Sequence, residues 1–202
     1  MNNPDPETPL SAADSLRLIE QMIHTAKREL GDNSFDILLW GWLVLAAALL
    51  HYGLLRAGFG LPWLSWVVLM PVGGVVSFVR GLKQQRRVRV RTAPTDFLPY
   101  LWGGFTVLLL MLLGVGAVRG WQLAYPLVIG LYGVGTFATG GALRFRPLLW
   151  GGAACWVLAT VAFRVAFEGQ LLLIAAAVLV AYVVPGHLLR KQYTKERHER
   201  TI

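Results

Sequence analysis

Few residues of this chain could carry chemistry, and most of them stand at the ends of apolar stretches. Arg164 and Glu168 are four positions apart, a spacing at which opposite charges pair on one face of a helix. We predict an ion pair there, with a gate or ligand contact as the alternative. His51 and His187 border different apolar stretches and are expected on opposite membrane sides, so they should not share a metal ion. We expect each imidazole to be satisfied by backbone or water.

Covalent catalysis would need a nucleophile with a base beside it. The rhomboid intramembrane proteases, which also have six helices, use a serine in one span and a histidine in another. Here the stretch 121–143 offers Thr136 and Thr139 but no serine, and no HExxH, GxSxG or phosphate-loop motif occurs. The single cysteine, Cys155, lies in an apolar run and supports neither a disulfide framework nor a cysteine-based metal site. We therefore predict a non-enzyme with no cofactor and no metal.

The composition explains why polar chemistry is so sparse. Of the 202 residues, 55% are hydrophobic and 15% are charged, whereas soluble globular chains carry about 25% charged residues. The mean hydropathy is +0.54 and the formal net charge is +8. These values argue against a disordered chain, a disulfide scaffold and an ordinary soluble enzyme.

Six apolar stretches dominate the chain, and each approaches the roughly 20 residues that a helix needs to cross a bilayer. The predicted fold is an all-α polytopic membrane protein, a bundle of six transmembrane helices. Its predicted parts are a cytoplasmic leader (1–34) with an amphipathic helix at 11–30, a transmembrane domain (35–189) with spans 37–55, 61–79, 97–118, 121–143, 147–163 and 170–189, and a basic cytoplasmic tail (190–202).

Basic residues in the short loops predict the orientation. If both termini are cytoplasmic, only Arg56, Arg119 and Arg164 lie outside, which leaves 16 of the 19 basic residues inside. The strongest cluster, which includes Arg86, Arg87, Arg89 and Arg91, is predicted to set topology and to touch anionic lipid headgroups. We expect no nucleic-acid binding, because no aromatic residue interleaves with this cluster.

Small residues and prolines predict where the spans pack or bend. Leu-Trp-Gly opens the spans that begin at 37, 97 and 147, which suggests three helical hairpins; the alternative is compositional coincidence. Small residues permit close helix approach, and prolines inside spans kink them. The predicted packing or kink positions are Pro71, Gly73, Gly74, Gly133, Gly135, Thr136, Thr139, Gly140 and Pro185.

The leader carries the clearest amphipathic pattern. One apolar face repeats at helical spacing, between a capping box at Ser11 and a C-cap at Gly31. Its opposite face balances acidic and basic residues and lacks aromatics, which favours protein contact over a lipid surface. The residues predicted to face a partner, or alternatively the bundle itself, are Leu16, Ile19, Ile23, Ala26 and Leu30.

Several segments resemble an uncharacterised family of bacterial six-helix integral membrane proteins. The similar segments are LRLIEQMI at 16–23, LWGW at 39–42, LMPVGG at 69–74, YGVGTF at 132–137 and VPGHLL at 184–189. The resemblance implies a protein of the bacterial cytoplasmic (inner) membrane and brings no assigned activity.

Two functions remain open from the sequence. The first is a non-catalytic scaffold or regulatory component that acts through its cytoplasmic face, with membrane lipids and either a cytoplasmic protein or a second copy as partners. The second is a small-solute permease or channel-like protein whose helices with Pro71 and Pro185 line the path.

Overall fold

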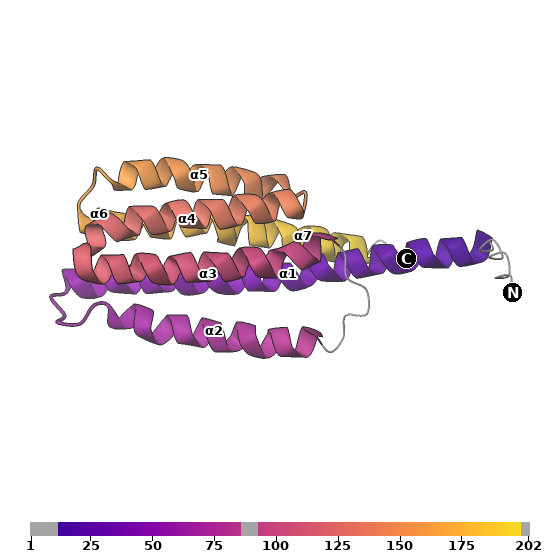
Figure 1. Ribbon diagram of the computed structural model, residues 1–202, viewed down its shortest axis with the longest axis horizontal. Coiled ribbons are helices and arrows are strands. Elements are labelled where there is room, and N and C mark those ends of the chain that lie inside the picture. The colour runs from indigo at the N-terminus through magenta and orange to yellow at the C-terminus, as the bar shows by residue number, and fades with distance from the viewer. Residues whose placement is uncertain (1–11, 86–92, 199–202) are drawn as a thin grey trace, which may run out of the picture.

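The part of the chain that the structure describes consists of helices joined by short turns. This computed structural model describes residues 12–85 and 93–198, and their side chains over 34–83 and 97–191. No strand occurs within these ranges (Figure 1). The elements in chain order are α1 (Ala12–Arg56), α2 (Leu64–Gln85), α3 (Ala93–Arg119), α4 (Trp121–Ala142), α5 (Arg146–Ala162), α6 (Phe167–Val178), the π-helical turn η1 (Leu179–Val183) and α7 (Val184–His198).

Five helical segments are long and apolar enough to cross a membrane. They are Ser34–Arg56 of α1, Leu64–Lys83 of α2, Phe97–Arg119 of α3, Trp121–Ala142 of α4 and the continuous segment Phe167–Lys191. Helix α5 has 17 residues, which makes it about 26 Å long at 1.5 Å per residue. That is somewhat shorter than a hydrocarbon core of about 30 Å.

Helix α1 is longer than the sequence predicted. It has 45 residues and runs without interruption through Gly31 to Arg56, so the predicted helix end at Gly31 is wrong. A glycine inside a helix costs only about 1 kcal/mol relative to alanine, and no proline follows to stop the helix. Figure 1 shows the N-terminal half of α1 projecting well beyond the other helices. The side chains predicted to face a partner, at Leu16, Ile19, Ile23, Ala26 and Leu30, lie outside the described side chains, and Arg86, Arg87, Arg89 and Arg91 lie outside the described residues.

Helices α1 to α5 and the continuous segment of α6, η1 and α7 run in alternating directions, and the bundle has a centre and a periphery. Helices α4 and α5 make the most extensive contact, while α1, α6, η1 and α7 complete the core. The core includes the fully buried side chains of Ile129, Leu148 and Ile174. Among the described helices, the backbone of α2 lies close only to α1, and that of α3 only to α4. Helices α2 and α3 are therefore peripheral and separate from each other.

Glycines bring α4 and α5 together. A β-carbon added at Gly133 would lie 2.6 Å from Trp156 Cδ1, and one at Gly140 would lie 2.8 Å from Leu148 Cβ. On α5, a β-carbon at Gly152 would lie 2.8 Å from the carbonyl oxygen of Gly133. Small residues allow this approach where lipid supplies no hydrophobic drive between helices.

The other predicted small residues have different surroundings. Gly135 faces the Phe105 ring of α3, and Gly73 faces Leu43 of α1. A β-carbon at Gly74 would meet no described atom within 4 Å, so Gly74 is not a close-packing position. The buried hydroxyls of Thr136 and Thr139 donate to carbonyls one turn back in their own helix, at 2.7 Å each. These threonines are thus satisfied within α4.

The two predicted kink prolines differ in their effect. Pro71 lies inside the continuous helix α2. Pro185 is fully buried, and the π-helical turn Leu179–Val183 ends just before it. A proline clashes with the carbonyl four residues earlier, here that of Ala181 within the π turn. A wider local turn relieves this clash and re-aims the helix.

Candidate apolar binding cavity

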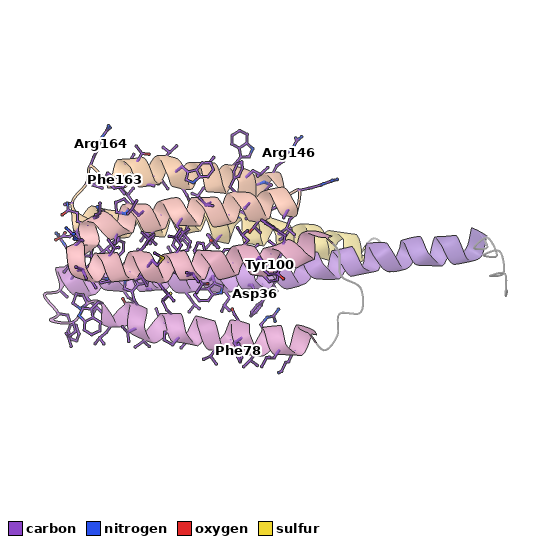
Figure 2. All side chains as sticks on the ribbon, in the orientation of Figure 1. Asp36, Phe78, Tyr100, Arg146, Phe163 and Arg164 are labelled. Carbon is purple, nitrogen blue, oxygen red and sulfur yellow. The ribbon has the colours of Figure 1, made fainter. Side chains whose placement is uncertain are left out.

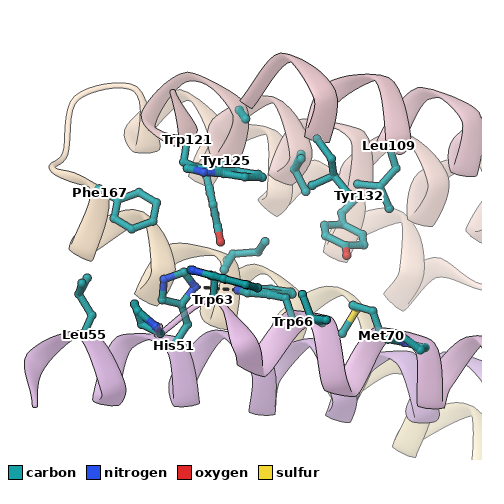
Figure 3. Close-up of a pocket in the computed structure, with 17 residues that line it drawn as sticks. His51, Leu55, Trp63, Trp66, Met70, Leu109, Trp121, Tyr125, Tyr132 and Phe167 are labelled. Atoms are coloured by element: carbon teal, nitrogen blue, oxygen red, sulfur yellow. Dashed lines mark hydrogen bonds between the residues drawn. The ribbon is translucent and has the colours of Figure 1, made fainter. Parts of the chain in front are cut away.

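A large cavity lies between α2 and the helices α3, α4 and α6. Its volume is about 840 Å³, and residues of five helices line it (Figure 3). This size falls within the roughly 300–1,000 Å³ of small-molecule pockets. The lining residues are His51 and Leu55 of α1, Pro62, Trp63, Trp66, Val67, Met70 and Pro71 on or just before α2, Leu109 and Leu113 of α3, Trp121, Ala124, Tyr125, Val128 and Tyr132 of α4, and Phe167 and Ile174 of α6.

The cavity opens sideways between α2 and α3. Lining residues on both lips are partly exposed: Val67 on α2 is 56% exposed and Leu113 on α3 is 39% exposed. The floor residues Val128 and Ile174 are buried, at 6% and 1% exposure. A molecule could therefore enter from the side without passing through either end of the bundle.

A hydrogen bond between two aromatic side chains fastens α2 to α1 beside the cavity. The indole Nε1–H of Trp66 donates to Nδ1 of His51 at 2.8 Å. His51 is buried, and its Nδ1 has a side-chain partner instead of the backbone or water partner that we expected. Because an indole N–H is only a donor, Nδ1 of His51 must carry its lone pair, and the proton of the neutral ring is on Nε2.

Three further contacts fasten α2 along its length. Trp40 Nε1 donates to Ser77 Oγ at 3.1 Å. Near Ser34, where the membrane-spanning segment of α1 begins, Arg80 Nε lies 3.8 Å from Asp36 Oδ1. The guanidinium of Arg80 also lies 3.8 Å from the centroid of the Phe35 ring. Polar pairs of this kind join helices in an apolar medium at modest gain, about 0.6 kcal/mol each on average. Helix α2 thus packs against α1 on one side and borders the cavity on the other.

Aromatic rings gather at the end of the cavity where α1 finishes, which we call the Arg56 end. Tyr125 is their centre: its ring meets those of Phe167 at 5.3 Å, Trp66 at 6.2 Å and Trp121 at 6.3 Å, in edge-to-face geometry. Figure 3 shows the Tyr125 hydroxyl pointing into the cavity, toward the side where His51 lies. Farther from the Arg56 end, the lining turns mainly aliphatic, with Met70 and Leu109 beside Tyr132.

The predicted ion pair of Arg164 with Glu168 is wrong, because Glu168 pairs with another residue. Its Oε2 lies 3.4 Å from Nη1 of Arg56, so the pair joins α6 to the end of α1. The prediction assumed one continuous helix, whereas a turn separates α5, which ends at Ala162, from α6, which begins at Phe167. Figure 2 shows Arg164 directed away from the bundle at the end of α5 opposite Arg146.

Gln170 is a functional candidate that the sequence reasoning missed. It is fully buried, and its Nε2 donates to the carbonyl oxygens of Gln122 and Ala162 at 2.9 Å each. It therefore ties α6 to the start of α4 and the end of α5, and fixes the helix that carries Phe167 and Ile174. The sequence already showed that Gln170 is a polar residue within an apolar span, and such a residue is expected to have a specific partner.

The predicted site residues do not gather at one place. Pro71 lines the cavity, whereas Pro185, Gly133 and Gly140 pack elsewhere in the bundle. His187 contacts the Trp42 ring edge-to-face at 6.4 Å, and does not line the cavity. Over the described part of the chain, no group of three or more His, Cys, Asp or Glu residues could hold a metal ion.

The fold and the cavity define a class: an all-helical protein with apolar helices of membrane-spanning length and an apolar cavity that opens at its side. No protein-family model, curated protein or solved structure matches the chain.

Proposed function

We propose that this protein is a non-catalytic integral membrane protein that binds an apolar molecule of the bilayer and acts as a regulatory component through its cytoplasmic face. The observation that carries the proposal is the sideways-opening cavity. Its wall is hydrocarbon and aromatic, and in a membrane-embedded bundle its mouth would face the hydrocarbon of the bilayer. An apolar cavity excludes water but accepts apolar molecules, and each buried CH₂ group contributes about 0.8 kcal/mol when it leaves water.

The topology proposed from the sequence places this cavity within the membrane. It has six spans, both termini in the cytoplasm, and the bacterial inner membrane as its location. The loop charges support it, because Arg56, Arg119 and Arg164 stand at one end of the helices, whereas the described basic residues Arg80, Lys83, Arg144, Arg146, Arg190 and Lys191 stand toward the other end. For α5 to be the sixth span, the bilayer would need to thin slightly around it, which costs little.

Helix α1 supports the regulatory part of the proposal. The same uninterrupted helix that lines the cavity with His51 and Leu55 extends back to Ala12. The portion before Ser34 has 22 residues (45 less the 23 of the span), so it reaches about 33 Å beyond the span. A change in α1 upon ligand binding would be carried to a cytoplasmic partner of residues 12–33.

Photo-crosslinking in native membranes tests the binding proposal. A lipid with a diazirine in its acyl chain labels whatever it touches, including the exposed faces of α2 and α3. Val128 and Ile174 are buried but line the cavity, whereas their neighbours Ile129 and Leu171 are buried and do not. We expect label at Val128 and Ile174 and none at Ile129 and Leu171. Absence of label from all four residues would contradict a lipid-filled cavity.

The alternative of a small-solute permease has one observation in its favour, because Pro71 lines the cavity. Pro185, which was predicted to line the same path, is fully buried and does not line the cavity. Solute uptake into vesicles that contain the purified protein separates the two functions. Uptake that disappears with Val67→Trp, at the mouth, would establish transport in place of simple binding.

A further inference from the structure

We infer that the cavity holds an uncharged lipid with a single hydrocarbon chain, whose carbonyl-bearing head lies among the aromatic residues at the Arg56 end. The inference rests on the proposed binding function and names the class of ligand. It follows from the balance of charge, of hydrogen-bond donors and of apolar wall along the cavity.

The wall of the cavity offers no charge to a ligand, and Arg119 and Arg164, which stand at the same end of the helices, are not part of the lining. Arg56 and Glu168 neutralise each other at 3.4 Å. No Asp, Glu, Lys or Arg residue lines the cavity itself. A charged head drawn into this wall would lose its hydration without gaining a counter-charge, which is strongly unfavourable. The charge balance therefore favours an uncharged head.

Hydrogen-bond donors outnumber acceptors around the same end. The only nitrogen acceptor, Nδ1 of His51, is already occupied by Trp66, which leaves the Nε2–H of His51 as a donor. The indole N–H groups of Trp63 and Trp121 can only donate, and neither has a partner among the described side chains. The Tyr125 hydroxyl adds a further donor directed into the cavity (Figure 3). A head that accepts hydrogen bonds, such as a carbonyl group, complements this set.

The part of the cavity away from the aromatic residues matches a hydrocarbon chain of a lipid. Away from the aromatic end, Val67, Met70, Leu109 and Val128 provide an aliphatic wall. The volume of about 840 Å³ lies in the range of drug-sized ligands, a size that a single-chain lipid shares. The sideways opening between α2 and α3 lets such a molecule enter from the bilayer chain first.

Three ligands that differ only in their heads test this inference: monooleoylglycerol (uncharged, with a carbonyl), oleyl sulfate (anionic) and oleyltrimethylammonium (cationic). Their binding to the full-length protein in detergent is measured by native mass spectrometry. We expect monooleoylglycerol to bind at least about tenfold more tightly than either charged ligand, because a charged head would be desolvated.

The variant Tyr125→Phe removes one donor and keeps the ring. We expect it to weaken monooleoylglycerol binding about fivefold, the effect of one lost hydrogen bond, and to leave the binding of oleyltrimethylammonium, whose head accepts no hydrogen bond, unchanged. Tyr100→Phe is the matched control, since Tyr100 is 81% exposed on α3 and outside the cavity. Equal unfolding temperatures of the two variants confirm that both are folded.

The outcomes separate this inference from the binding function on which it rests. Equal binding of the three ligands, or an unchanged affinity in Tyr125→Phe, overturns the inference and leaves hydrocarbon binding intact. Tightest binding of oleyltrimethylammonium also overturns it, because the aromatic cluster would then act as a cage for a cation. Binding of none of the three contradicts the proposed function itself.

Discussion

The indole of Trp66 and the imidazole of His51 form a 2.8 Å hydrogen bond that joins α2 to α1 at the edge of the cavity. Both rings also contact the opposite wall, because Trp66 meets Tyr125 of α4 at 6.2 Å and His51 meets Phe167 of α6 at 5.7 Å. The same pair therefore fastens the peripheral helix and shapes the aromatic end of the binding site.

Removal of this hydrogen bond should destabilise the protein. Trp66→Phe keeps a ring but leaves the buried Nδ1 of His51 without its donor, at a cost of about 1–3 kcal/mol. We expect a lower midpoint of thermal unfolding in detergent than for the unaltered chain. Trp150→Phe is the control, because Trp150 is 76% exposed. Equal midpoints for the two variants would show that the bond does not stabilise α2.

The contact between α4 and α5 should tolerate no added methyl group. Gly152→Ala places its β-carbon 2.8 Å from the Gly133 carbonyl oxygen and from Phe137 Cβ, and such overpacking typically costs about 1–3 kcal/mol. Gly104→Ala has open space around it, and alanine is the better helix former by about 1 kcal/mol. In thermal unfolding, we expect a lower midpoint for Gly152→Ala and an equal or higher one for Gly104→Ala. A midpoint for Gly152→Ala that matches Gly104→Ala would refute the close approach.

Gln170 should hold the helix ends together through its amide. Gln170→Leu preserves much of the volume but deprives the carbonyls of Gln122 and Ala162 of their donor, at a cost of about 1–3 kcal/mol. We expect loss of stability and faster amide hydrogen exchange at the start of α6. In Gln122→Leu, the backbone carbonyl remains and the altered side chain is exposed, so it serves as the control. Unchanged exchange in Gln170→Leu would contradict this role.

The ion pair should couple Glu168 to Arg56 and not to Arg164. The pair is well exposed, with side chains 65% and 49% accessible, so solvent screening limits the coupling to about 0.2–1 kcal/mol. A double-mutant cycle on Arg56→Ala and Glu168→Ala should give a coupling in this range. The cycle with Arg164→Ala in place of Arg56→Ala should give none, and the reverse result would restore the original prediction.

The positions of the helices were predictable because apolar runs end where chain reversals begin. The predicted span 121–143 corresponds to α4, Trp121–Ala142, and 147–163 corresponds to α5, Arg146–Ala162. The helix end predicted at Gly31 was wrong, because α1 continues through Gly31 into the apolar span. A single glycine disfavours a helix by only about 1 kcal/mol, which is too little to end it there. The uninterrupted length of α1 therefore had to come from the structure.

The cavity could not be predicted, because it depends on which helices fail to meet. Nothing in the spacing of Trp66 and His51 reveals that their side chains pair, and the separation of α2 from α3 is a tertiary property. The pairing of Glu168 was mispredicted because spacing alone does not show that a turn intervenes at 163–166. Gln170 was recognisable by its polarity, although its carbonyl partners on two other helices were not.

Lipid retention in two neighbouring variants tests the central claim most directly. Val67 lines the mouth of the cavity, whereas Val68, with almost the same exposure, does not. Native mass spectrometry of the full-length protein, extracted gently from membranes, should show a bound lipid in the unaltered chain and in Val68→Trp. In Val67→Trp the indole fills the mouth, and retention should fall at least about tenfold, equivalent to ~1.4 kcal/mol. Equal retention by the two variants, or no bound lipid in the unaltered protein, would contradict a cavity that holds a molecule of the bilayer.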